Sequence, residues 1–201
     1  MALSLTVAII LVTVVVSWLA FNNDKLLQRL LLWPPAVTRG RQYDRFVTYG
    51  LVHGDFMHLL FNMITLYFFG GAMEQFYAGY LGPWGFLGFY ASALVVSALP
   101  SYLRHRHDPN YATLGASGAV SAVLFAFVLL QPWATIYVYV VPVPAIVFAV
   151  LYTGYSVWMN RRQADQVNHS AHLAGAAYGV LFTVLMEPRV LEDFLASLLG
   201  P

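Results

Sequence analysis

Charged residues are missing from several long stretches of this chain, and these gaps predict where it crosses a membrane. A transmembrane helix needs about 20 predominantly apolar residues to cross ~30 Å of hydrocarbon. Residues 1–23 carry no charge, and further apolar stretches separate Asp55 from Glu74 and Glu74 from Arg104. We interpret the first stretch as a retained helix, because it has neither the basic start nor the clear cleavage site of a signal peptide.

The longest uncharged stretch, the 52 residues between Asp108 and Arg161, is too long for one span. Prolines at 132, 142 and 144 interrupt it, and proline lacks the N–H that a helix interior needs. The pattern therefore predicts an all-α membrane protein that forms one domain over residues 1–201. Its six transmembrane helices are expected near residues 3–21, 56–73, 81–103, 114–131, 136–158 and 168–186.

The composition supports the membrane class. Charged residues make up 9% of the 201 and apolar residues 60%, whereas soluble domains carry roughly 25% charged residues. The absence of Cys excludes a disulfide scaffold, thiolate catalysis and thiolate metal sites. The formal net charge of +1 gives no electrostatic basis for nucleic-acid binding.

Polar residues gather at the starts of three predicted helices, and polar residues inside a membrane are costly and therefore informative. In an up-down bundle the second, fourth and sixth spans run parallel, so these starts lie at one membrane face. Groups in the first two turns lie within roughly 10 Å of that face. The three clusters are His53, Asp55, His58 and Asn62; residues 115–118 with Ser121; and Asn168, His169, Ser170 and His172.

Ser, His and Asn at one depth suit nucleophilic catalysis. Without Cys, and without Asp or Glu in the last three spans, the available nucleophile is a serine, which needs an adjacent base at neutral pH. Histidine has a pKa suited to that role. His58 and Asn62 are four residues apart, so they share a helix face, and both can donate hydrogen bonds to an oxyanion.

Small residues on two of these helices favour close packing. The fourth span begins with the sequence Gly-Ala-Ser-Gly at 115–118. On the sixth span, Gly175 and Gly179 form a G-x-x-x-G face, which lets membrane helices approach closely. Such an approach would bring a short Ser side chain within reach of an imidazole.

Together these motifs resemble the rhomboid family of intramembrane serine proteases, over roughly residues 40–186. The resemblance implies a six-transmembrane-helix rhomboid-like bundle. The motif G-x-S-G alone is a weak signal, but it occurs here with H-x-x-x-N and H-x-x-G-x-x-x-G at the corresponding helix starts. The matching segments are H-G-D-F-M-H-L-L-F-N-M (53–63), G-G-A-M-E (70–74), G-A-S-G-A-V (115–120) and A-H-L-A-G-A-A-Y-G (171–179).

By this resemblance the chain is a serine endopeptidase that cleaves transmembrane segments of other membrane proteins without any cofactor. Ser117 would be the nucleophile and His172 the general base, a Ser–His dyad without a carboxylate. His58, Asn62 and the backbone N–H of Ser117 would form the oxyanion hole. Residues with supporting roles would be Gly115 and Gly118 in the tight backbone around the serine, Gly175 and Gly179 at the helix contact, and Arg45 in the first loop. The fifth span and its following loop resemble a lateral gate for substrates.

Two positions depart from the family pattern. Many members have Trp before the loop arginine, where this chain has Asp44. Many also have an aromatic residue four positions after the nucleophile, on which the base stacks, where this chain has Ser121. The second departure concerns how His172 is packed and not its identity.

Other interpretations of these residues stay open. Ser117 could be a small interface residue, Asn62 could only link helices, and Glu74 is expected to cap or anchor the far end of its span. Histidines occur in near pairs, but an H-E-x-x-H signature is absent, so we predict no metal site. The main alternative function is a non-catalytic rhomboid-like membrane chaperone or dislocation factor, although such relatives typically lack the Ser or the His.

Two signals disagree about membrane orientation. All Lys and Arg residues except Arg189 flank the predicted site face, which by the positive-inside rule places that face toward the cytoplasm. The resemblance instead places the site toward the extracytoplasmic side of a bacterial inner membrane. We follow the resemblance, because the first loop is expected to be a structured element and not a free tether. The expected partners are transmembrane protein substrates and the lipid bilayer, and the sequence does not indicate an oligomeric state.

Overall fold

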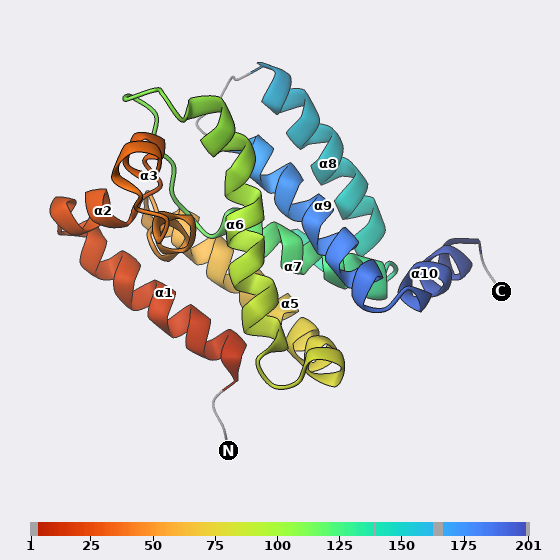
Figure 1. The fold of residues 1–201 in the computed structure, drawn as a ribbon. Coiled ribbons are helices and arrows are strands. Elements are labelled where there is room, and N and C mark those ends of the chain that lie inside the picture. Colours follow the sequence, from red (N-terminus) through yellow and green to blue (C-terminus); the bar gives the residue numbers. More distant parts are fainter. Residues whose placement is uncertain (1–3, 139, 163–166, 200–201) are drawn as a thin grey trace.

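The computed structural model describes residues 4–138, 140–162 and 167–199. These residues form a bundle of helices that encloses the central helix α7 (Figure 1). In chain order the elements are α1 (Leu5–Phe21), α2 (Asp24–Leu30), α3 (Pro34–Gly40), α4 (Arg45–Thr48), η1 (Tyr49–Leu51), α5 (Phe56–Leu81), α6 (Gly85–His105), α7 (Ser117–Leu130), β1 (Thr135–Val138), β2 (Val141–Pro144), α8 (Ala145–Arg162), α9 (His169–Met186) and α10 (Arg189–Leu199).

Each of the six predicted spans overlaps a helix, namely α1, α5, α6, α7, α8 or α9. Among the described residues, α5, α6 and α9 are long and apolar enough to cross a membrane. Helices α1 and α7 are apolar but shorter, and α8 ends in Asn160, Arg161 and Arg162. Length and hydropathy therefore support three spans. The first position of the predicted span 3–21 and position 139 of the predicted span 136–158 lie outside the described residues.

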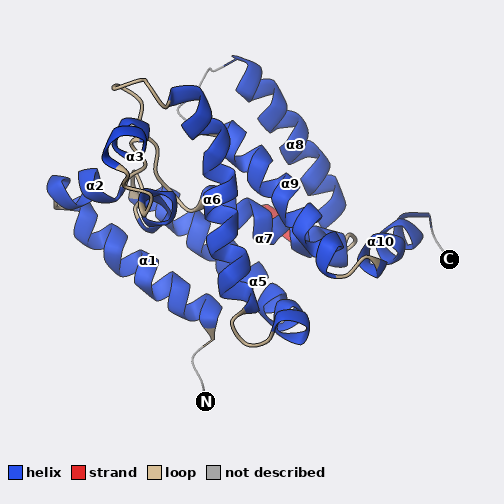
Figure 2. Ribbon diagram, viewed as in Figure 1, coloured by secondary structure: helices blue, strands red, loops and turns tan. Residues whose placement is uncertain are grey.

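The prediction of a helix from residue 136 is wrong. Strands β1 and β2 form an antiparallel hairpin at this place (Figure 2), with Thr135 opposite Pro144 and Val138 opposite Val141. Proline at 142 and 144 cannot supply helical N–H donors, whereas β-branched residues favour an extended backbone. Helix α8 therefore begins only at Ala145.

Glu74 interrupts the apolar pattern but not the helix, since α5 continues from the predicted end at 73 to Leu81. Its carboxylate accepts hydrogen bonds from the backbone N–H groups of Leu5 (2.8 Å) and Thr6 (2.9 Å) and from the hydroxyls of Ser4 (2.6 Å) and Thr6 (2.7 Å). The first N–H groups of a helix have no partner within it. Glu74 thus caps the start of α1 and anchors that helix to α5, and it does not cap the end of its own helix as expected.

Helix α7 owes its central place to its small residues. Ten of its 14 residues are buried, and it packs against α5, α6, α8 and α9. Gly175 and Gly179 of α9 lie directly against its backbone. A Cβ atom at 175 would collide with the carbonyl group of Gly118, and one at 179 with that of Ala122. The two helices therefore approach backbone to backbone.

The first loop holds the segment that leads into α7. Leu32 and Thr113 exchange two backbone hydrogen bonds of 2.9 and 3.0 Å, and the N–H of Gly115 donates to the carbonyl of Tyr49 at 2.9 Å. Arg45 organises this loop from within. Its side chain is buried and donates to the carbonyls of Gln28 and Leu31. The loop is thus a folded platform beside the start of α7.

Candidate active site

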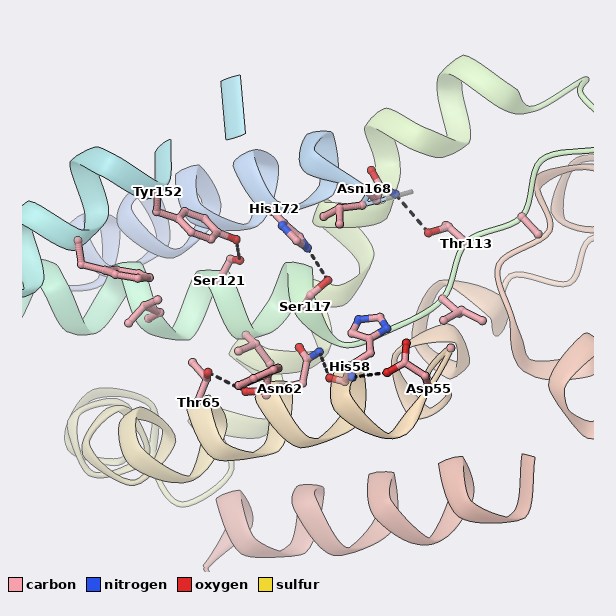
Figure 3. A pocket seen from close by; sticks show the side chains of 18 residues that line it. Asp55, His58, Asn62, Thr65, Thr113, Ser117, Ser121, Tyr152, Asn168 and His172 are labelled. Carbon is pink, nitrogen blue, oxygen red and sulfur yellow. Dashed lines mark hydrogen bonds between the residues drawn. The ribbon is translucent and has the colours of Figure 1, made fainter. Parts of the chain in front are cut away.

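Ser117 and His172 meet where α7 and α9 begin. Ser117 is the first residue of α7 and His172 lies in the first turn of α9. The Nε2 atom of His172 lies 2.7 Å from the Oγ atom of Ser117 (Figure 3). This distance is within hydrogen-bond range, so the imidazole can accept the hydroxyl proton.

Backbone geometry aims Ser117 at this position. Gly115 has φ +109°, a conformation that costs residues with a side chain much more than glycine. Gly118 faces Ser97, whose hydroxyl a Cβ at position 118 would meet. On the α9 side, the Asn168 side chain caps the helix by accepting from the N–H of Ala171 at 3.1 Å. The chain can therefore turn sharply into α7 and lie close to α6 and α9.

His58 and Asn62 face this pair from α5 (Figure 3). Asp55 caps α5 by accepting from the N–H of His58 at 2.8 Å. The His58 ring lies against Gly115, where a Cβ would come 2.6 Å from its Cε1 atom. Asn62 is buried and donates to the carbonyl of His58 at 2.8 Å. A primary amide carries two N–H donors, so this bond uses only one of them.

One cavity of about 680 Å³ joins these residues. Its lining comes from α5, α7, α8, α9 and the loop at 112–114. The lining includes Ser117, His172, His58 and Asn62, so the structure brings the four predicted catalytic residues together. Gly175, Gly179 and Arg45 lie outside the cavity lining, at the α7–α9 contact and in the first loop. These three residues contact neighbouring backbone and do not line the cavity.

The sequence pattern places His53 among the polar residues at the helix starts, but it does not predict a role for this residue. Its Nε2 atom accepts the N–H of Ala116 at 3.3 Å, and its Nδ1 atom lies 3.0 Å from the hydroxyl of Ser17. Since Nε2 accepts, the neutral ring carries its proton on Nδ1 and donates to Ser17, which donates in turn to the carbonyl of Leu51 at 2.8 Å. This chain of bonds links α1 to the residue before Ser117.

Burial, with a smaller contribution from the neighbouring His58, lowers the pKa of His53 to about 3. The ring is therefore neutral at physiological pH, as its hydrogen bonds require. Its position in the motif 53–63 hinted at a function. However, its partners are distant in sequence, and no local pattern could identify them.

Tyr152 of α8 is the second missed residue. Its ring stacks on that of His172, with centroids 6.1 Å apart and an angle of 21° between the planes. Its hydroxyl lies 2.9 Å from that of Ser121. An aromatic residue therefore does pack on His172, but it comes from α8 and not from α7.

The described residues contain no group of three His, Asp or Glu side chains that could hold a metal ion. Asp55, the acidic residue nearest His53 and His58 in the sequence, is occupied as a helix cap. The polar side chains that line the cavity carry hydroxyls, imidazoles, amides and the carboxylate of Asp55. This set suits acyl transfer through a serine.

A sequence profile of the Rhomboid domain matches residues 40–189. RHOMBOID-like protein 12, mitochondrial, of Arabidopsis thaliana is 28% identical over 184 residues, which cover 84% of this chain and 53% of that protein. Rhomboid protein 1, mitochondrial, of Saccharomyces cerevisiae is 33% identical over 137 residues, 65% of this chain and 38% of that protein. The Rhomboid protease GlpG of Haemophilus influenzae is 25% identical over 165 residues, 82% and 79% of the two chains.

The chain thus spans about half the length of the mitochondrial relatives or less, and most of the bacterial protease. The profile match covers most of the chain, and it includes the three helices α5, α6 and α9 that can cross a membrane. This integral membrane protein therefore belongs to the rhomboid family.

Proposed function

We propose that this protein is an intramembrane serine endopeptidase that cleaves transmembrane segments of other membrane proteins through a Ser117–His172 dyad. The observation that carries the proposal is the 2.7 Å contact between Ser117 Oγ and His172 Nε2, two residues that line the cavity of about 680 Å³. Membership of a family that includes a named protease supports it. In this proposal the whole chain acts as one domain with six membrane-spanning helices.

The reaction begins when His172 Nε2 takes the hydroxyl proton of Ser117 and Oγ attacks the carbonyl carbon of the scissile peptide bond. His58, Asn62 and the N–H of Ser117 donate to the resulting oxyanion. One such donor is worth roughly 3–4 kcal/mol in other serine proteases. His172 then protonates the leaving amine as the C–N bond breaks, which leaves an acyl ester on Ser117. Water hydrolyses this ester and restores the serine, so the cycle needs neither metal nor nucleotide.

The substrate is expected to reach the site sideways from the bilayer. A second cavity of about 820 Å³ runs between α5, α7, the β-hairpin and α8, and its lining is largely apolar. It shares Phe61, Thr65, Leu124 and Phe148 with the site cavity. A helical substrate has to unwind before Ser117 can reach its backbone, because helical hydrogen bonds shield the peptide group. Gly, Pro or small polar residues near the cut should therefore favour cleavage.

Labelling with a serine-directed fluorophosphonate tests the proposal in detergent-solubilised protein. We expect the wild type to be labelled, and Ser117→Ala and His172→Ala to be folded but unlabelled and unable to cleave a transmembrane substrate. His58→Ala and Asn62→Ala should slow cleavage by ~10²-fold or more. A folded wild type that takes no label would contradict the proposal and favour the non-catalytic membrane chaperone.

We also propose that the site faces the extracytoplasmic side of a bacterial inner membrane. By the positive-inside rule, the basic residues of the first loop count against this orientation. Two of them carry less weight in that count, because they belong to folded structure. Arg45 is buried in the loop, and Arg29 pairs with Asp44 at 2.7 Å, so both belong to a folded element. The relatives described above are one bacterial and two mitochondrial proteins, and a bacterial host therefore suits the test.

Single cysteines can report the orientation, because the native chain has none. Asn110 is exposed at the site face and Pro83 is exposed at the opposite face, between α5 and α6. In intact bacterial cells, an impermeant thiol reagent should label Asn110→Cys and not Pro83→Cys. The reverse pattern would place the site toward the cytoplasm.

A further inference from the structure

The packing of His172 differs from the family pattern in a way that the structure explains. Ser121 stands one turn after Ser117 on α7, and its side chain is too short to stack on an imidazole. Tyr152 supplies the ring instead and comes from α8 (Figure 3). The hydroxyls of Ser121 and Tyr152 lie 2.9 Å apart. A small residue on α7 and an aromatic residue on α8 thus share a task that one residue could perform.

We propose that Tyr152 is the positioning residue for His172, held in place by Ser121, and that it makes the reactivity of the dyad depend on the position of α8. The proposal rests on the function proposed above. It concerns an aromatic residue on a different helix from the one that carries the nucleophile.

The ring of Tyr152 is fixed from several sides. Phe148, one turn earlier on α8, stacks on it at 5.7 Å and 26°, and Phe125 of α7 lies 5.8 Å away. The bond to Ser121 fixes the position of its hydroxyl. A ring held in this way offers one flat face to His172. Because stacking restricts rotation of the imidazole about its side-chain torsions, it keeps Nε2 directed at Ser117.

The same contacts reach the path of the substrate. Phe148 lines both the site cavity and the apolar cavity between α5 and α8, and Tyr152 lines the site cavity. A segment that enters through the apolar cavity would pass Phe148, which contacts Tyr152. If α8 moves outward to admit the segment, Tyr152 loses its contacts with Ser121 and with His172 at the same time. The His172 imidazole is then directed at Ser117 again only after α8 has moved back.

The test separates the reactivity of the dyad from substrate entry. The labelling rate with a small fluorophosphonate reports Ser117 and His172 without requiring a substrate helix to enter. Cleavage of a transmembrane substrate gives kcat and KM. The variants are Tyr152→Leu, Tyr152→Phe and Ser121→Ala, and Tyr67→Leu is the matched control on the exposed surface of α5.

We expect Tyr152→Leu to lower both the labelling rate and kcat by roughly 10–100-fold, since a small misplacement of a catalytic group has this effect, and to leave KM within about twofold. Tyr67→Leu should match the wild type. A folded Tyr152→Leu variant that is labelled at the wild-type rate overturns the proposal. A change confined to KM also overturns it, because Tyr152 would then contact substrate and not position the base.

The conservative variants keep the proposal testable if Tyr152→Leu does not fold. Tyr152→Phe and Ser121→Ala remove the two ends of one hydrogen bond and leave the ring in place. Each should slow labelling a few-fold, and the double variant should be no slower than either, because coupled residues are not additive. Wild-type rates in all three, or additive losses, refute the role of the bond. An unlabelled wild type would instead refute the proposed function itself.

Discussion

Gly175→Ala tests the close approach on which the candidate site depends. A Cβ at this position would lie 2.7 Å from the carbonyl carbon of Gly118 and 3.2 Å from its Cα. Carbon atoms in contact prefer roughly 3.5–4.0 Å. The obstacle is backbone and cannot rotate away, so α7 and α9 have to separate by roughly 1 Å.

That separation reaches Ser117, because it precedes Gly118 in the chain. Its 2.7 Å contact with His172 would lengthen to roughly 3.7 Å, beyond hydrogen-bond range. Overpacking of this kind costs about 1–3 kcal/mol of folding free energy. A displaced catalytic group can slow the reaction by ~10²-fold. We therefore expect both a lower unfolding temperature and slower fluorophosphonate labelling.

The measurement compares thermal unfolding and labelling rate in detergent for Gly175→Ala and Gly88→Ala. Gly88 is an exposed position on α6, and a Cβ added there would have no neighbouring atom within 4 Å. Alanine there should leave the labelling rate unchanged and stabilise the helix by up to ~1 kcal/mol. If Gly175→Ala behaves like Gly88→Ala in both assays, the backbones of α7 and α9 do not meet at Gly175.

Contacts outside the dyad give three further predictions. Gly115→Ala should abolish labelling, because the new Cβ would meet the His58 ring at 2.6 Å in a backbone with φ +109°; labelling at the wild-type rate would contradict this. Glu74→Gln should lower the free energy of unfolding by about 1.5–3 kcal/mol, because its hydrogen bonds to α1 become weaker, and it should have little effect on the labelling rate. A loss of activity without a loss of stability would argue against a purely structural cap. His53 is neutral in the folded state, while its pKa in the unfolded chain is near 6.5. Its contribution to the free energy of unfolding is therefore complete above pH 6.5 and is lost as the pH falls toward 3. The loss reaches roughly 2 kcal/mol at pH 5, and the unfolding temperature of His53→Gln should fall less than that of the wild type between pH 7 and 5; equal falls would refute this account.

Local spacing predicted some parts of the site well. His58 and Asn62 share a face of α5 because they are four residues apart, and the small residues of α7 and α9 indicated that two backbones could meet. The hairpin at 135–144 was missed, since its apolar residues suit a membrane helix and a strand equally and only Pro142 and Pro144 argue otherwise. Tyr152 could not be predicted, because its contacts with Ser121 and His172 join three helices that are distant in sequence.

The turn just before the hairpin anchors the start of α8 and limits how this helix can move. The helix is fixed at its first residues, where the N–H groups of Ala145 and Ile146 bond to the carbonyls of Ala134 and Pro132 at 2.8 Å. At ~1.5 Å per residue, Tyr152 lies about 10 Å from this pivot and Arg162 about 26 Å. If α8 rotates as a rigid helix about its first residues, a displacement of ~5 Å at Arg162 moves Tyr152 by only ~2 Å. Added to the 2.9 Å between the Tyr152 and Ser121 hydroxyls, that shift would take them to about 5 Å, beyond hydrogen-bond range. In the proposed coupling, a modest opening at the membrane surface would therefore be enough to release the ring.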